Sequence, residues 1–149
     1  MNKTWRWLAL GAAGVVLAAA ALLWANNTFA SGRGANPAPG LANTHWSLVS
    51  INGQAPIAGR ALTLSFQSDS QLGGDSGCNS YGGQYHINGS DMAVTQLIST
   101  LRACAEQPLN DQEAVFQKAL GDAAQFGLAG NQLTLKNASG GEVLMFQKQ

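Results

Sequence analysis

Charged side chains are scarce in this chain of 149 residues. They make up 11% of it, and 8 Lys and Arg balance 8 Asp and Glu, whereas an average domain has about 25% charged residues. A nucleic-acid-binding protein needs a clustered excess of Lys and Arg, and a disordered chain combines low hydrophobicity with high net charge. The composition therefore excludes both classes and predicts a folded domain that does not bind nucleic acid.

Histidine and cysteine are equally rare, with two residues of each. His45 and His86 are isolated in the sequence and no Cys-x-x-Cys pair occurs, so the chain lacks the ligand spacing of a zinc site. The first cysteine is Cys78, so none lies directly after the N-terminal apolar run to accept a lipid, which argues against a lipoprotein. We expect neither a metal nor a cofactor.

Common catalytic and phosphate-binding motifs are absent as well. No Gly-x-Ser-x-Gly elbow occurs, and the glycine-rich stretch from Leu72 to Gly83 lacks the Gly-Lys-Ser/Thr ending of a phosphate-binding loop. Asp69 and Asp75 lack the alternating ligand spacing of a calcium loop and are expected in a solvated turn. The sequence therefore offers no candidate catalytic residue.

The longest apolar run extends from Leu8 to Ala25. Lys3 and Arg6 precede it, and no acidic residue occurs before Asp69, which is the charge pattern of an export signal. As a helix rising about 1.5 Å per residue, the run reaches roughly 27 Å, close to the thickness of a bilayer. Residues 1–30 are therefore predicted to be either a cleaved signal peptide or a retained membrane anchor.

The rest of the chain divides into a tether and one domain. Basic residues of an export signal stay in the cytoplasm, so we expect the remainder in the periplasm or on the outer face of the cytoplasmic membrane. Residues 31–44 are rich in Gly and Pro, which is typical of a flexible tether. The domain is expected at residues 45–149. In that compartment, Cys78 and Cys104 favour a disulfide over two unpaired thiols.

Alternating apolar and polar residues dominate the chain from Trp46 onward. The pattern is typical of half-buried strands and recurs at 62–67, 85–87, 126–128 and 133–136, and the chain closes with an apolar run at 143–146. Turn signals such as Asn52-Gly53 and Asn88-Gly89 separate the strands. We expect about seven antiparallel strands in a sheet that curls or closes.

One segment has the period of a helix. Asn110 and Glu113 resemble a capping box, and Phe116, Leu120 and Ala123 recur at helical spacing, which predicts a helix of about 11 to 14 residues. A sheet with one apolar face must bury that face against another element. The predicted fold is mostly β with one α-helix (α+β), an antiparallel, partly open barrel that the helix plugs.

Several short motifs in the predicted domain resemble those of one known family. They are Gly77-Cys78-Asn79-Ser80-Tyr81-Gly82-Gly83-Gln84-Tyr85, Thr100-Leu101-Arg102-Ala103-Cys104, Glu113-x-x-Phe116 and Trp46-Ser47-Leu48. Over about residues 42–148, the chain is similar to the META domain of HslJ-like (heat-shock protein HslJ) envelope proteins.

The resemblance implies a fold, a location and a disulfide. In the family, the cysteines that match Cys78 and Cys104 look like a disulfide pair, and the fold is an antiparallel, partly open barrel with one helix. Members are commonly bacterial envelope proteins, and several are named for induction by heat shock. No established catalytic activity comes with the resemblance. Arg102 stands where relatives often carry Met, which argues against full burial of this position.

Two interpretations of the motif tyrosines stay open at this point. Tyr81, Gly83 and Tyr85 share one face of a strand, and the small residues beside them leave room for a bulky group. If Phe116 of the helix or an aromatic such as Trp46 fills that room, the tyrosines belong to the core. If the room stays open, Tyr81 and Tyr85 line a ligand groove, with Trp46 next to them.

The leading hypothesis is therefore a monomeric, exported, non-catalytic module of the envelope with a binding or stress-related role. It would bind an envelope protein, a peptide or a lipid through a sheet edge or the barrel mouth. The alternatives are a small envelope hydrolase with an unrecognised site and a purely structural accessory domain. An enzyme requires a pocket with convergent polar groups, whereas a binding module requires only a groove or an exposed edge.

Overall fold

The computed structural model describes residues 40–102 and 104–149. They form eight strands and one helix: β1 (Thr44–Ile51), β2 (Thr63–Phe66), β3 (Gln71–Asp75), β4 (Ser80–Asn88), β5 (Asp91–Ser99), α1 (Gln107–Gly121), β6 (Gln125–Ala129), β7 (Gln132–Lys136) and β8 (Glu142–Lys148). No helix in this part of the chain is long and apolar enough to cross a membrane. The predicted signal peptide or anchor at 1–30 lies outside the described residues.

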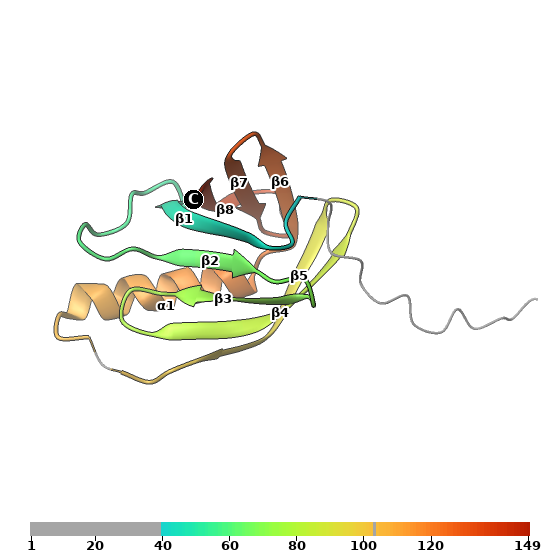
Figure 1. Cartoon of the computed structure of the whole chain (residues 1–149). Coiled ribbons are helices and arrows are strands. Elements are labelled where there is room, and N and C mark those ends of the chain that lie inside the picture. Colours follow the sequence, from blue (N-terminus) through green and yellow to red (C-terminus); the bar gives the residue numbers. More distant parts are fainter. Residues whose placement is uncertain (1–39, 103) are drawn as a thin grey trace, which may run out of the picture. The chain divides into compact units, whose positions relative to one another are not determined.

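Every strand pairs antiparallel with its neighbours in sequence, and β8 pairs with β1 to close the ring (Figure 1). The contact between β5 and β6 is the weakest, since it consists of the single residue pair Asp91 and Gln125. Helix α1 packs against β5, and also against β8 and β1 farther round the ring. The predicted antiparallel barrel with one covering helix is confirmed, with eight strands in place of about seven.

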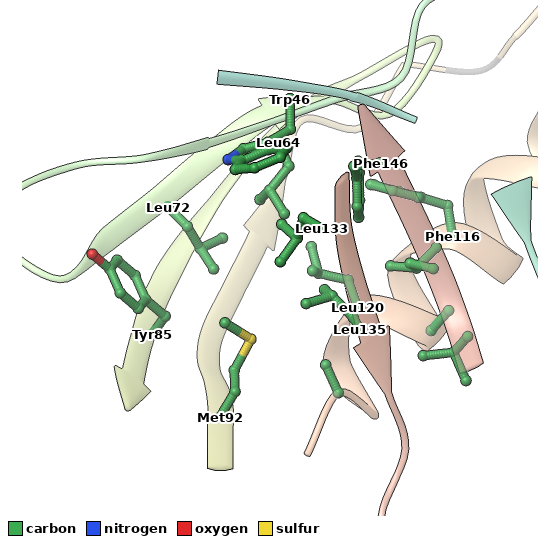
Figure 2. Packing of buried hydrophobic residues seen from close by; sticks show 14 of the residues in the cluster. Trp46, Leu64, Leu72, Tyr85, Met92, Phe116, Leu120, Leu133, Leu135 and Phe146 are labelled. Atoms are coloured by element: carbon green, nitrogen blue, oxygen red, sulfur yellow. The ribbon is translucent and has the colours of Figure 1, made fainter. Parts of the chain in front are cut away.

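The core lies between the inner face of the ring and α1. Leu64 and Phe66 of β2 are buried while Thr63 and Ser65 between them are partly exposed, as the period of two predicts. Figure 2 shows side chains from the strands and the helix meeting in one cluster, among them Trp46, Leu64, Leu72, Tyr85, Met92, Phe116, Leu120, Leu133, Leu135 and Phe146.

The helix contributes its predicted face to this core. Phe116 and Leu120 are fully buried. The ring of Phe116 lies 5.6 Å from that of Tyr81 and 6.5 Å from that of Phe146, both in edge-on geometry, which aromatic pairs favour. Phe116 thus fills the space beside the motif tyrosine, as the first of the two interpretations expected.

Strand β3 corrects the expectation of a solvated turn around Asp75. Its residues include Gly73 and Gly74, which have low strand propensity, yet the segment pairs with both β2 and β4. A Cβ atom on Gly73 would lie 2.9 Å from the carbonyl oxygen of Tyr81, and one on Gly74 would lie 2.8 Å from the carbonyl carbon of Thr63. The glycines therefore allow strands to approach where any side chain would collide.

Helix α1 begins at Gln107, three residues before the predicted start, and contains 15 residues. Pro108 occupies its first turn, where proline is well tolerated because its missing N–H has no helical partner anyway. The side chain of Asn110 does not cap the helix, since its Oδ1 accepts a hydrogen bond from Cys104 N at 2.9 Å. The capping box predicted from Asn110 and Glu113 is wrong.

The domain begins earlier than predicted. Leu41 is fully buried, the hydroxyl of Thr44 donates to the carbonyl oxygen of Leu41, and Trp46 Nε1 donates to Thr44 Oγ1 at 2.7 Å. Residues 40–44 therefore belong to the folded domain and not to the tether. The remainder of the predicted tether, residues 31–39, lies outside the described residues.

Candidate functional site

The two cysteines form a disulfide. Their Cα atoms lie 5.7 Å apart, within the usual range of about 4.4 to 6.8 Å, so the predicted pairing is confirmed. Cys78 follows β3 and precedes β4, whereas Cys104 precedes α1. The bond therefore ties the start of β4 to the segment that leads from β5 into the helix.

Asn79, next to the disulfide, makes four side-chain hydrogen bonds. Its Oδ1 accepts from Thr100 Oγ1 at 2.8 Å and from the backbone N–H of Arg102 at 2.7 Å. Its Nδ2 donates to the carbonyl oxygen of Arg102 at 3.0 Å and to Glu113 Oε2 at 2.8 Å. These bonds use both donors and both lone pairs of the amide. One buried side chain thus connects β4, the segment after β5, and α1.

Glu113 is a buried carboxylate held by neutral donors. Besides Asn79, the hydroxyl of Ser76 donates to its Oε1, and the residue is 8% exposed. Buried charges are tolerated only with such hydrogen bonds, so Glu113 has a structural role. Its carboxylate and the sulfurs of Cys78 and Cys104 lie within 4.8 Å of one another, but the disulfide occupies both sulfurs and leaves no thiolate to bind a metal.

An open groove of about 360 Å³ lies against this cluster, and we call it the α1 groove. It runs between the end of β5, the segment that follows, and one face of α1, and it is lined by Asn79, Ser99, Thr100, Leu101, Arg102, Asn110, Glu113, Ala114 and Gln117. The helix residues recur at the spacing of a single helix face. The groove is therefore built by the elements that the disulfide and Asn79 hold together.

Two large apolar side chains, one near the end of β5 and one in the segment after it, are exposed. Leu101, which lines the groove, is 98% exposed, and Ile98 near the end of β5 is 73% exposed. Arg102 is exposed too, as its departure from the family pattern indicated. Within the described ranges, the one salt bridge joins Lys118 and Asp122, so the guanidinium of Arg102 has no carboxylate partner there.

The residues proposed to line a ligand groove are core residues instead. Trp46 and Tyr85 are 1% exposed and Tyr81 is 6% exposed. Tyr81 donates to the carbonyl oxygen of Thr63 at 2.7 Å, and Tyr85 donates to that of Gln67 at 2.9 Å. The interpretation of these three as a binding surface is therefore wrong, because their rings pack inside the barrel and both phenols are already bonded.

Burial also determines the ionisation of the two phenols. It raises the pKa of Tyr81 above the usual value, and the nearby charge of Asp75 raises it further. Burial likewise raises the pKa of Tyr85, with a smaller contribution from Asp69. Both tyrosines thus remain protonated hydrogen-bond donors and have no role in proton transfer near neutral pH.

The other motif residues support the same scaffold. Gly77 has a φ of +109°, a conformation that side chains rarely adopt, and it sets the direction of the chain just before the disulfide. A Cβ atom on Gly83 would lie 3.0 Å from the carbonyl oxygen of Thr95. Thr100 bonds to Asn79 as described above, and Ala103 lies outside the described residues.

The two histidines and the two aspartates of the Gly-rich region do not converge on one site. His86 is exposed on β4. The Nδ1 atom of His45 on β1 lies 2.9 Å from Ser65 Oγ. Asp75 accepts a hydrogen bond from the backbone N–H of Gly77, and Asp69 lies in the turn before β3. None of the four lines the α1 groove.

Sequence reasoning missed the groove itself. Asn110, Glu113, Ala114 and Gln117 form a small and polar stripe at helical spacing, and this signal could have identified the lining face of α1. The contact of Asn79 with Arg102 joins residues 23 positions apart, and no sequence pattern marked it.

Comparisons with known proteins agree with this fold. A family model, the META domain, matches residues 39–149. A protein from Burkholderia xenovorans, solved by NMR, is 26% identical, with a TM-score of 0.60 over 73% of this chain and 83% of that chain. A second NMR structure is also 26% identical, with a TM-score of 0.59 over 72% of this chain and 90% of the other.

A more distant structure resembles this chain in fold alone. It is a crystal structure of a DUF4847 family protein from Bacteroides vulgatus, 14% identical, with a TM-score of 0.50 over 72% of this chain and 93% of that chain. Comparison with curated proteins gave no significant match. Because the family model covers nearly all of the described domain, including the disulfide and the Asn79 cluster, the chain belongs to the META-domain family.

Proposed function

We propose that this META-domain protein is an exported, non-catalytic module of the bacterial envelope that binds an extended segment of a partner protein in the α1 groove. The basic and apolar N-terminal pattern supports export, and the disulfide fits an oxidising compartment. A monomer that acts under envelope stress is part of the proposal, on the resemblance to proteins named for heat-shock induction.

The observation that carries the proposal is the exposure of Leu101 at a groove whose wall is rigidly held. A side chain of this size that is 98% exposed costs free energy in water, and exposed apolar groups that cluster beside a cleft mark interaction sites. The groove is open to solvent, and amide side chains line it from α1 and from Asn79. This shape suits an extended polypeptide better than a lipid chain, which needs an enclosed apolar channel.

The chemistry of the groove argues against catalysis. Glu113 is the one carboxylate that lines it, and both of its oxygens accept hydrogen bonds from Ser76 and Asn79. A general base must reach the substrate and needs a partner of opposite role, whereas Glu113 is 8% exposed and no second acid or base among the described residues lines the groove beside it.

A photo-crosslinking amino acid at position 101 of the full chain, expressed in a bacterial host, tests the proposal. We expect it to yield a defined covalent adduct with a segment of one envelope protein. The matched control carries the same amino acid in place of Ala138, which is exposed in the turn between β7 and β8. Equal adducts at both positions, or none at 101, would contradict the proposal.

Export and the absence of catalysis are tested separately. A reporter enzyme that is active only outside the cytoplasm, fused after Gln149, is expected to be active, whereas a cytoplasmic reporter at the same position is not. Turnover of an envelope substrate by the purified protein, lost in the variant Glu113→Gln when that variant is still folded, would show that the domain is an enzyme.

A further inference from the structure

We propose that the segment bound in the α1 groove is acidic, with a carboxylate that pairs with Arg102 next to a large apolar side chain that packs on Leu101. This inference rests on the function proposed above and adds the chemistry of the partner. It follows from which polar groups of the groove are already bonded within the domain and which are not.

Most polar side chains of the groove are committed to internal hydrogen bonds. Asn79 uses its whole amide, as described above. Thr100 donates to Asn79, Gln117 Nε2 donates to Ser99 Oγ at 3.1 Å, and Asn110 Oδ1 accepts from Cys104 N. A partner with neutral polar side chains would find few free groups here, and burying its polar atoms without partners would weaken binding.

Arg102 is the exception among the lining side chains. Its guanidinium is exposed and takes part in none of the side-chain hydrogen bonds or salt bridges found among the described residues. The other charged group of the groove, Glu113, is buried and held by Ser76 and Asn79, so it does not compete for the guanidinium. A carboxylate matches this planar fork of N–H donors with two parallel hydrogen bonds.

The backbone of Arg102 is held in place before any partner arrives. Asn79 bonds both to its N–H and to its carbonyl oxygen, and the disulfide anchors the chain two residues further on, at Cys104. Fixing a binding residue in advance lowers the entropy that association must overcome. Leu101 is adjacent in sequence, so the acidic and the apolar residue of the partner should be close neighbours in its sequence.

Selection from a random octapeptide library displayed on phage tests the inference, with the purified full chain as bait. We expect selected peptides to be enriched in Asp or Glu within two residues of Leu, Ile, Val or Phe. In the variant Arg102→Gln the preference for Asp and Glu should disappear, and peptides selected on the wild type should bind it roughly fivefold more weakly.

Lys148→Gln provides the matched control, because Lys148 is an exposed cation on β8 that does not line the groove. This variant should select the same acidic peptides as the wild type. Selected peptides that bind Leu101→Asp more weakly than the wild type, but that show no preference for Asp or Glu, would overturn the inference and leave the proposed function standing. If no selected peptide binds Leu101→Asp more weakly than the wild type, both the inference and the proposed function are overturned.

Discussion

At the scale of single residues, Asn79 connects the buried interior to the exposed groove. Its Nδ2 donates to the buried carboxylate of Glu113. Its Oδ1 accepts from the backbone N–H of Arg102, whose side chain is exposed. Aspartate, of the same size, would lose both N–H donors and place a second negative charge beside Glu113. The position therefore requires the amide and not only its shape.

Replacement of Asn79 by Ala should lower the free energy of unfolding by about 2 to 4 kcal/mol, because it leaves Glu113 and Thr100 with fewer partners in a buried site. Urea denaturation followed by fluorescence measures the change. Asn88→Ala, at the exposed end of β4, is the control and should change stability by less than about 0.5 kcal/mol. Similar values for both variants would show that the Asn79 hydrogen bonds contribute little.

The phenol of Tyr81 should couple stability to alkaline pH. Burial and Asp75 raise its pKa in the folded protein, whereas the unfolded chain has the usual value of about 10. Above pH 10 the unfolded state therefore binds fewer protons than the folded state, and stability falls as pH rises.

Tyr81→Phe should lower stability by about 1 to 3 kcal/mol at pH 7, since the carbonyl oxygen of Thr63 loses its donor. It should also make the decline above pH 10 shallower, and urea denaturation between pH 7 and 11 measures both effects. A variant with the same slope as the wild type would show that Tyr81 ionises equally easily in both states.

At the scale of elements, strands and a helix with a clear apolar period were predictable from the sequence, whereas strands without such a period were not. The alternation in β2 and the apolar face of α1 follow from which side chains must leave water, and both were predicted. Strand β3 has glycines in place of an alternating pattern and exists because β2 and β4 pair with it. Its residues alone do not favour a strand.

Strand β5 was not predicted for a related reason. Gln96 adopts a φ of +53°, and the register with β4 shifts between the pairs Gln84–Thr95 and Gly82–Ile98. Such a bulge breaks the period of two, so the apolar residues no longer alternate along the segment. The same irregularity precedes Ile98 and the segment that forms one wall of the groove, which explains why this wall, unlike the α1 face, could not be derived from periodicity.

Phe116→Ala should lower the free energy of unfolding by about 3 to 5 kcal/mol, because the ring is fully buried between Tyr81 and Phe146. Thermal or urea denaturation measures the loss. Val115→Ala is the matched control on the same helix, since Val115 is 45% exposed, and its effect should be several times smaller. An unchanged midpoint for Phe116→Ala would contradict the packing of α1 described here.

Loss of the disulfide should destabilise the link between β4 and α1. Cys104→Ser is expected to lower stability by roughly 2 to 5 kcal/mol, as removal of a native bridge from a small secreted domain does. Thiol labelling of the wild-type protein, denatured without reductant, provides the direct check and should find no reactive thiol. Two labelled thiols per chain would show that Cys78 and Cys104 are not bonded in the isolated protein.

At the scale of the whole molecule, the family motifs contain two groups of residues, one that builds the barrel and one that lines the α1 groove. Glycines, tyrosines and the disulfide of the motifs build the barrel and its interior, whereas other motif residues line the groove, namely Asn79, Thr100, Leu101, Arg102 and Glu113. The motif was therefore sufficient to predict the family and the fold. It was misleading about the site, because its aromatic residues pack inward.

The proposed function depends on the contact that a partner makes with the groove. Calorimetric titration of the partner segment identified by crosslinking, into the wild-type chain and the variants Leu101→Asp and Val49→Asp, measures that contact directly. Val49 is an exposed apolar residue on β1 that does not line the groove. Because the bound segment would cover most of Leu101, we predict that Leu101→Asp weakens binding by at least about tenfold while Val49→Asp leaves it unchanged. Equal affinity of all three proteins would contradict a binding role for the α1 groove.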